Sequence, residues 1–182
     1  MEKPTIVYLM RHGSITLKPG DIFCGNPEIS KEGIEESKKV AKGFEKLEKK
    51  ISVMYTSTLK RAHQTAEIIG NTLKVEVIKI REFEEFEKAL FEKSKFNLEF
   101  WKNYLKYDEA KQLFEKIIKK REGENILFVL HGNVIKGILK SKMKISFKKA
   151  GKFRSDNCGI TKLIFLKNKL KMVKSFNSSQ VN

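Results

Sequence analysis

Near its start the chain reads Val7-Tyr8-Leu9-Met10-Arg11-His12-Gly13, an apolar run of strand-forming residues that stops at an arginine, a histidine and a glycine. Buried parallel strands are typically continuous apolar runs, and in open α/β sheets ligands bind beyond the carboxyl ends of the strands. The same pattern recurs at residues 125–132, where an apolar run ends in His131-Gly132. We therefore expect two strands whose terminal imidazoles, His12 and His131, face one pocket.

Other short apolar runs, bounded by turn residues, predict further strands. They lie at residues 51–55, 74–80, 160–166 and 170–173, and the last two are expected to form a closing hairpin. Between the strands, one helix is expected to follow Ser30 as its N-cap, and another is expected to run from Leu59 to a stop at Gly70. Strands that alternate with helices indicate an α/β fold, here a three-layer α/β/α sandwich around a mostly parallel central sheet.

The length of 182 residues fits one domain, residues 1–182, with a substantial hydrophobic core. The stretch from Arg81 to about Lys120 is predicted to be helical and is rich in aromatic residues. Aromatic side chains at helical spacing usually pack into a core. The alternative is a small helical cap over a pocket, within about residues 83–120.

The formal net charge of +16 favours anionic partners such as nucleic acid, an acidic membrane surface or phosphorylated small molecules. Because the lysines are scattered among glutamates, a generally lysine-rich composition explains most of this charge. No apolar run reaches the roughly 18 residues of a membrane span, so no membrane association is expected. The start of the chain lacks a signal-peptide layout, and Cys24 and Cys158 form neither a metal spacing nor a disulfide framework. Reduced thiols in the cytoplasm are therefore expected.

A third landmark lies directly after the second predicted strand, at residues 56–66, where Arg61 is close enough to the strand end to reach the same pocket. The other nearby histidine, His63, follows Arg61 by two and points elsewhere on a helix, so we interpret it as structural. Two arginines and two histidines without a metal-ligand cluster suit the binding of a phosphoryl group. Arginine grips phosphate oxygens with a planar, bidentate fork, and a neutral imidazole can attack phosphorus.

These stretches resemble the motifs of the histidine phosphatase superfamily, also called the phosphoglycerate mutase-like family. The matching motifs occur in the family's order over nearly the whole chain: Leu9-Met10-Arg11-His12-Gly13, Ile29-Ser30-Lys31-Glu32-Gly33, Ser57-Thr58-Leu59-Lys60-Arg61-Ala62, Gln64-Thr65-Ala66, Val129-Leu130-His131-Gly132 and Asn157-Cys158-Gly159. The Arg-His-Gly motif alone is a weak signal, whereas the ordered set is specific.

The resemblance implies that His12 is the nucleophile that becomes phosphorylated and that Arg11, Arg61 and His131 form the phosphate pocket. It implies no metal and no cofactor. It also implies a carboxylic acid after the third strand that protonates the leaving oxygen and later activates water. Glu82 aligns best with this acid, and Glu84 and Glu85 are its rivals.

The chain departs from the family's pattern at Ser14 and Lys18, where glutamate and asparagine are frequent; Lys18 either approaches the phosphate or is solvated. Inside the family we favour a phosphatase acting on a small phosphorylated metabolite, because a cap of this size encloses the site less than the larger insertions of a mutase. The alternatives are a cofactor-dependent phosphoglycerate mutase and, from another class, a basic module that binds RNA or another polyanion with a degraded site. Nucleic acid is not the favoured partner, and the oligomeric state stays open, with a dimer as one option.

Overall fold

The computed structural model describes residues 2–16, 26–87, 90–91, 98–178 and 181. Along the described chain the elements are β1 (Thr5–Arg11), α1 (Lys31–Glu45), β2 (Val53–Ser57), α2 (Lys60–Leu73), β3 (Val77–Ile80), the short 3-10 helix η1 (Arg81–Phe83), α3 (Leu98–Lys120), β4 (Asn125–Leu130), α4 (Gly132–Met143), α5 (Phe147–Gly151), β5 (Ile160–Leu166) and β6 (Lys169–Ser178). Strands and helices alternate as the sequence predicts, and the two strands that end in histidine are β1 and β4.

The described strands form one sheet in the order β3-β2-β4-β1-β5-β6. The strands β3, β2, β4 and β1 run parallel to one another. The strand β5 runs antiparallel to both of its neighbours, β1 and β6. The expectation of a mostly parallel sheet is therefore right for four strands only, and the sheet is mixed. The antiparallel pairing of β6 with β5 follows from the closing hairpin: Lys167 and Asn168 both adopt positive φ, the conformation of a tight two-residue turn that sends the chain straight back beside β5.

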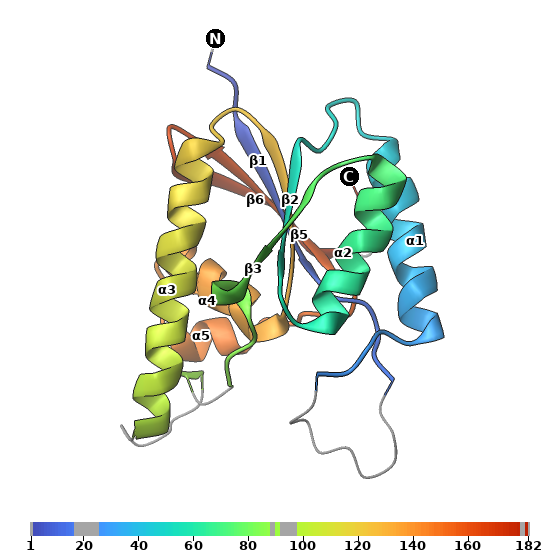
Figure 1. Ribbon diagram of the computed structural model, residues 1–182. Helices are drawn as coiled ribbons and strands as arrows, with labels where there is room; N and C mark the ends of the chain where they lie inside the picture. The colour runs from blue at the N-terminus through green and yellow to red at the C-terminus, as the bar shows by residue number, and fades with distance from the viewer. Residues whose placement is uncertain (1, 17–25, 88–89, 92–97, 179–180, 182) are drawn as a thin grey trace.

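The sheet is covered by helices on both faces, so the predicted three-layer α/β/α fold is confirmed (Figure 1). Alternate residues of a strand point to opposite faces. Accordingly, Val7 and Leu9 of β1 belong to the core cluster that includes α3 and α4. Tyr8 and Met10 belong to the cluster that includes α1 and α2. The central strands are buried on both sides, which explains why their sequences are continuous apolar runs.

A local capping signal sets the start of α1, whereas the glycine near the end of α2 serves packing. Ser30 caps α1 as predicted, since its side chain accepts a hydrogen bond from the backbone N–H of Gly33 over 3.1 Å. The predicted stop of α2 at Gly70 is wrong, because the helix continues to Leu73. Gly70 instead permits close packing: a Cβ there would lie 2.5 Å from a methyl group of Val77 on β3.

The aromatic segment between β3 and β4 is largely core packing in its described carboxyl half. The ring of Phe114 on α3 lies 5.1 Å from that of Phe128 on β4, and Ile117 and Ile118 are buried beside it. The amino half of α3 is more exposed, with Leu98, Trp101 and Leu105 at the surface. Residues 88–89 and 92–97 of the predicted cap lie outside the described residues.

Across the described chain, none of the helices combines the length and the apolar character that crossing a bilayer would need.

Candidate active site

The two strand-terminal histidines lie side by side at the carboxyl edge of the sheet. Arg11 of β1 is paired with Leu130 of β4 in a parallel register, so His12 and His131 leave neighbouring strands at the same level. Their ring centroids are 5.3 Å apart with the planes tilted by 60°, and both side chains are buried. This separation lets one tetrahedral anion contact both imidazoles.

The ring of His12 is held so that one nitrogen is left as a base. Nδ1 lies 2.8 Å from the carbonyl oxygen of Gly13; because a carbonyl can only accept, Nδ1 carries the proton and Nε2 has the lone pair. Burial lowers the pKa of His12 from 6.5 to about 3; the Gly13 carbonyl opposes this shift, and the charges of Arg11 and Arg61 add to it. At neutral pH the ring is therefore an uncharged nucleophile.

The backbone around His12 is fixed by side chains from distant parts of the chain. Asn157 Nδ2 donates to the carbonyl oxygen of His12 over 3.1 Å. The N–H of Gly13 donates to Thr65 Oγ1 on α2 over 3.0 Å. On the far side, Glu36 of α1 accepts from both the N–H and the hydroxyl of Ser14. Thr65 and Asn157 lie in the motifs quoted above, but nothing in the sequence predicts these contacts.

Both arginines reach the pocket. Arg61 comes from the first turns of α2, and its Nε lies 3.2 Å from Nε2 of His12. Arg11 donates through one terminal nitrogen to the carbonyl oxygen of Ser155 over 2.6 Å. The structure thus brings together all four side chains that the sequence predicts for a phosphate pocket.

Two of these side chains keep a buried nitrogen without a hydrogen-bond partner. Among the described residues, three buried side-chain atoms lack one: Arg11 Nε, His131 Nδ1 and Asn125 Oδ1. Asn125 begins β4, at the opposite edge of the sheet. Buried polar groups are nearly always satisfied, so two unpartnered nitrogens on the residues flanking His12 indicate the place of an anionic ligand.

Of the three candidate glutamates, Glu85 reaches the site. Glu82, which aligns best with the family's acid, does not reach it. Glu82 is exposed on η1, while Glu84 lies next to it and hydrogen-bonds Thr58. Glu85 accepts a hydrogen bond from the backbone N–H of Asn133, in the first turn of α4, over 3.1 Å. The physical reason is the 3-10 turn after β3: it turns residue 82 outward and delivers residue 85 to the amino end of α4.

The surroundings of Glu85 change the pKa of its carboxyl. Burial raises the pKa of its carboxyl from 4.5 to about 7, while the N–H groups of Asn133 and Val134 and the charges of Arg61 and Arg11 oppose the shift. A carboxyl with a pKa near neutrality can donate a proton in one step and take one up in the next. This is the arrangement that an acid–base catalyst requires.

The remaining candidates lie elsewhere or are unreactive. His63 faces Glu67 one turn further along α2, at 3.3 Å. Cys158 is buried, and this burial raises the pKa of its thiol to about 12, so it is no nucleophile. Lys18 and Cys24 lie outside the described residues.

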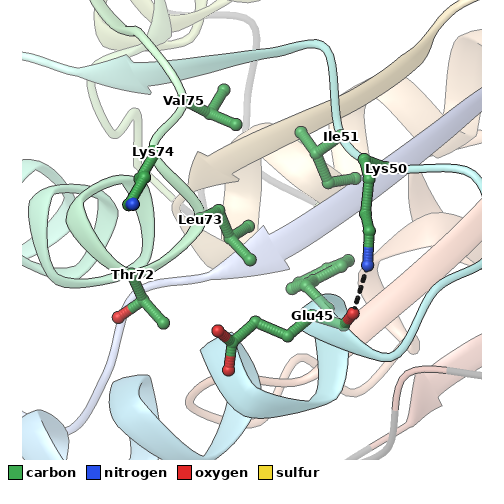
Figure 2. Close-up of a pocket in the computed structure, with 8 residues that line it drawn as sticks. Glu45, Lys50, Ile51, Thr72, Leu73, Lys74 and Val75 are labelled. Carbon is green, nitrogen blue, oxygen red and sulfur yellow. Dashed lines mark hydrogen bonds between the residues drawn. The ribbon is translucent and has the colours of Figure 1, made fainter.

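Figure 2 shows a hollow that is separate from this site. It is lined by the ends of α1 and α2 and by residues that precede β2 and β3, among them Lys50 and Lys74. It therefore lies at the amino edge of the sheet, opposite the histidines. Its lining includes no histidine or arginine.

Comparison with known proteins agrees with this geometry. The chain is 27% identical to a candidate phosphoserine phosphatase of Hydrogenobacter thermophilus, over 86% of this chain and 88% of that protein. Its fold is similar to a crystal structure of a phosphoserine phosphatase mutant from Entamoeba histolytica in complex with phosphoserine, with a TM-score of 0.74, 24% identity and coverage of 97% and 98% of the two chains.

A phosphoglycerate mutase from Bacillus anthracis is also similar in fold, with a TM-score of 0.76, 18% identity and coverage of 98% and 95%. The model of the histidine phosphatase superfamily (branch 1) matches residues 7–106 and 106–178, which include every residue of the site described above. The chain therefore belongs to the histidine phosphatase superfamily.

Proposed function

We propose that this protein is a metal-independent phosphatase that hydrolyses a small phosphomonoester through a phosphohistidine on His12. The observation that supports this most strongly is the pair of unpartnered nitrogens, Arg11 Nε and His131 Nδ1, buried beside an uncharged His12. Two guanidinium groups supply fixed positive charge, which suits a phosphoryl dianion and leaves no need for a metal ion to neutralise it.

In the first step, Nε2 of His12 attacks phosphorus and the bond from phosphorus to the ester oxygen breaks. Glu85 gives its proton to that oxygen, and the alcohol leaves. Arg11, Arg61 and His131 hold the three other oxygens of the phosphoryl group, where charge stabilisation accounts for most of the rate in phosphoryl transfer. Arg61 has to release the lone pair of His12 for this step, because its Nε donates a hydrogen bond to it.

In the second step, a water molecule attacks the phosphorus of phospho-His12. The Glu85 carboxylate, now unprotonated, takes a proton from this water, and the bond between nitrogen and phosphorus breaks. Inorganic phosphate leaves, and His12 is again neutral with its proton on Nδ1. Glu85 is protonated once more, so the cycle is closed without any other reactant.

We favour hydrolysis over the mutase reaction because a mutase has to keep water away from its phosphohistidine. The segment at 83–120, which would exclude water, is of limited size. We place this activity in one domain, residues 1–182, that works in the cytoplasm and has a small helical cap within about residues 83–120. Phosphoserine is the first substrate to test, since the Entamoeba enzyme binds it in a fold of the same kind.

The test is phosphorus labelling of the protein. With phosphoserine and other phosphorylated metabolites labelled at phosphorus, the native protein is expected to release phosphate in the presence of EDTA and to carry an acid-labile label. His12→Ala is expected to lose both. The matched control is His63→Ala, which removes a histidine from α2 outside the site and is expected to retain both.

Three results would overturn the proposal. The first is turnover by His12→Ala at the native rate, and the second is activity that EDTA abolishes. The third is transfer of the label between substrate positions faster than its release as phosphate, which would identify a mutase.

A further inference from the structure

Ser57, the last residue of β2, contacts the second histidine of the site. Its Oγ lies 2.7 Å from Nε2 of His131, and it also accepts a hydrogen bond from the N–H of Leu59 over 3.0 Å. The serine is fully buried. Neither the sequence motifs nor the roles described above give this hydroxyl a function.

The hydrogen bond between Ser57 and His131 can be arranged in two ways. His131 is uncharged, because burial and the neighbouring cations hold its pKa well below 6.5, so its ring carries a single proton. Either the ring donates from Nε2 to the hydroxyl, or the hydroxyl donates to Nε2 and the ring proton is on Nδ1.

The first arrangement leaves two groups unsatisfied. Ser57 Oγ would then accept from both Leu59 and His131, and its own proton would have no acceptor within the described part of the chain. Nδ1 of His131 would present a lone pair among the groups that bind the anion, and a lone pair repels phosphoryl oxygens. Unsatisfied buried polar groups of this kind are costly.

The second arrangement leaves one group without a partner instead of two. The hydroxyl accepts from Leu59 and donates to Nε2, and Nδ1 keeps an N–H that has no partner among the described residues. That N–H is the donor that the proposed mechanism requires from His131. We propose that Ser57 is a positioning residue, whose hydroxyl donates to Nε2 of His131 and so keeps the ring proton on Nδ1 for the phosphoryl group.

This inference rests on the proposed function for its consequence in catalysis, but the tautomer can be measured without turnover. In ¹⁵N NMR spectra of the native protein, His131 is expected to show protonated Nδ1 and unprotonated Nε2. Addition of inorganic phosphate is expected to shift the Nδ1 signal and leave that of Nε2 nearly unchanged. A native spectrum with the proton on Nε2 would overturn the inference by itself.

The variant Ser57→Ala tests the consequence. Without the hydroxyl, the ring proton is expected to redistribute towards Nε2. The value of kcat/KM is expected to fall by about 10- to 100-fold, the usual effect of losing a hydrogen bond that orients a functional histidine. An unchanged tautomer or unchanged kinetics in a folded Ser57→Ala protein would contradict the role.

The chain offers a matched control one residue earlier. Thr56 is equally buried, and its hydroxyl donates to the carbonyl oxygen of Val129 on β4 over 3.0 Å, away from His131. Thr56→Val therefore removes a buried hydroxyl from the same strand at a similar cost in stability, and it is expected to leave the His131 tautomer and kcat/KM unchanged. A tautomer shift in both variants would mean that the effect is merely structural.

The outcomes separate this inference from the proposed function. If the native protein forms no phospho-His12 but shows the Nδ1 tautomer, the proposed function fails and the role of Ser57 in the ring's protonation stands. If the native protein is an active phosphatase with its His131 proton on Nε2, the inference about Ser57 fails alone.

Discussion

Nε of Arg61 lies 3.2 Å from Nε2 of His12, so the guanidinium donates a hydrogen bond to the lone pair of the proposed nucleophile. The contact keeps a buried base satisfied until a phosphate arrives. A phosphoryl group offers the guanidinium charged oxygens, which are stronger acceptors than a neutral imidazole. In the proposed mechanism, substrate binding therefore also frees the lone pair of His12.

The first prediction concerns this guanidinium. Arg61→Lys keeps the charge but loses the planar fork, so kcat/KM is expected to fall by about 100-fold or more, the effect of losing one donor to a developing anion. Steady-state kinetics with phosphoserine or another accepted substrate provide the measurement. Lys60→Ala is the control, since Lys60 forms an exposed ion pair with Glu28 that contributes little. Equal losses in both variants would argue against a special role for Arg61.

The second prediction separates the glutamates after β3. Glu85→Gln is expected to lower kcat by about 10²- to 10⁴-fold for an alkyl phosphate, because general acid catalysis contributes that much. The loss in kcat/KM, which reports His12 phosphorylation, should be far smaller for p-nitrophenyl phosphate, whose leaving group departs without a proton. The value of kcat should still fall for this substrate, because the hydrolysis of phospho-His12 needs Glu85 as the base. Glu82→Gln, with its exposed side chain, is the control and is expected to keep the native kcat. A large loss in Glu82→Gln alone would restore Glu82 as the acid.

The third prediction is the pH dependence of the first chemical step. Glu85 has to be protonated to act as an acid, and its pKa is raised to about 7 by burial. The rate of His12 phosphorylation is therefore expected to fall as the pH rises through about 7. It should not fall on the acid side until the pH approaches about 3, where His12 becomes protonated. Single-turnover rates measure this profile, and the fall near pH 7 should be missing in Glu85→Gln.

The fourth prediction links the same two groups to stability. His12 has a pKa of about 3 in the folded protein and 6.5 as its ordinary value, so the unfolded chain binds the extra proton, and stability from this group is lost as the pH falls from 6.5 towards 3. Glu85 has the opposite sign, because its folded pKa is raised from 4.5 to about 7. The folded protein binds that proton, and stability from Glu85 is lost as the pH rises from 4.5 to 7.

Urea unfolding at pH values between about 4.5 and 6.5 tests these signs. Relative to the native protein, His12→Gln is expected to reduce the slope of the unfolding free energy against pH by up to about 1.4 kcal/mol per pH unit. Glu85→Gln is expected to increase the slope by a similar amount. Parallel curves for the three proteins would show that neither group has the shifted pKa described here.

The fifth prediction concerns the contact between α1 and the loop after β1. A Cβ on Gly33 would lie 2.2 Å from the carbonyl oxygen of Ser14, so Gly33→Ala is expected to push α1 away from that loop and destabilise the fold by about 1–3 kcal/mol. Gly43→Ala makes the same substitution in the same helix. Among the described residues its Cβ meets the side chain of Val181, 3.0 Å from a methyl group and 3.4 Å from Cβ, and it meets no backbone atom, so that variant is expected to be neutral or more stable by up to about 1 kcal/mol. If Gly33→Ala and Gly43→Ala changed the melting temperature equally, the close contact between Gly33 and Ser14 would be refuted.

Much of the site could be predicted because its residues follow strands that the sequence marks by itself. The runs before His12 and His131 are apolar over their whole length because β1 and β4 are covered on both faces. Burial on both faces can therefore be recognised from the residue types of the strand alone. The parallel register then brings the two histidines to one level. Arg61 follows β2 in the same way. These positions depend on where strands end, which is a local property.

The choice among Glu82, Glu84 and Glu85 was beyond the sequence. Three carboxylates within four residues differ little in local preference, and their roles are decided by a 3-10 turn and by the N–H of Asn133, which is 48 positions away along the chain. Burial then raises the pKa of Glu85 to about 7. The partner of Ser57 is likewise remote, since His131 belongs to a different strand end.

Apolar patterns and strand ends are local features, and they were enough to predict the layered α/β fold, the order of its elements and the four side chains proposed to bind the anion. Contacts between distant segments settled three further points: Glu85 is the glutamate at the amino end of α4, Gly70 packs against β3 instead of ending α2, and β5 runs antiparallel to β1. Each of these depends on the distance between segments far apart in the chain, and on the desolvation that their contact produces, neither of which is encoded in any single stretch.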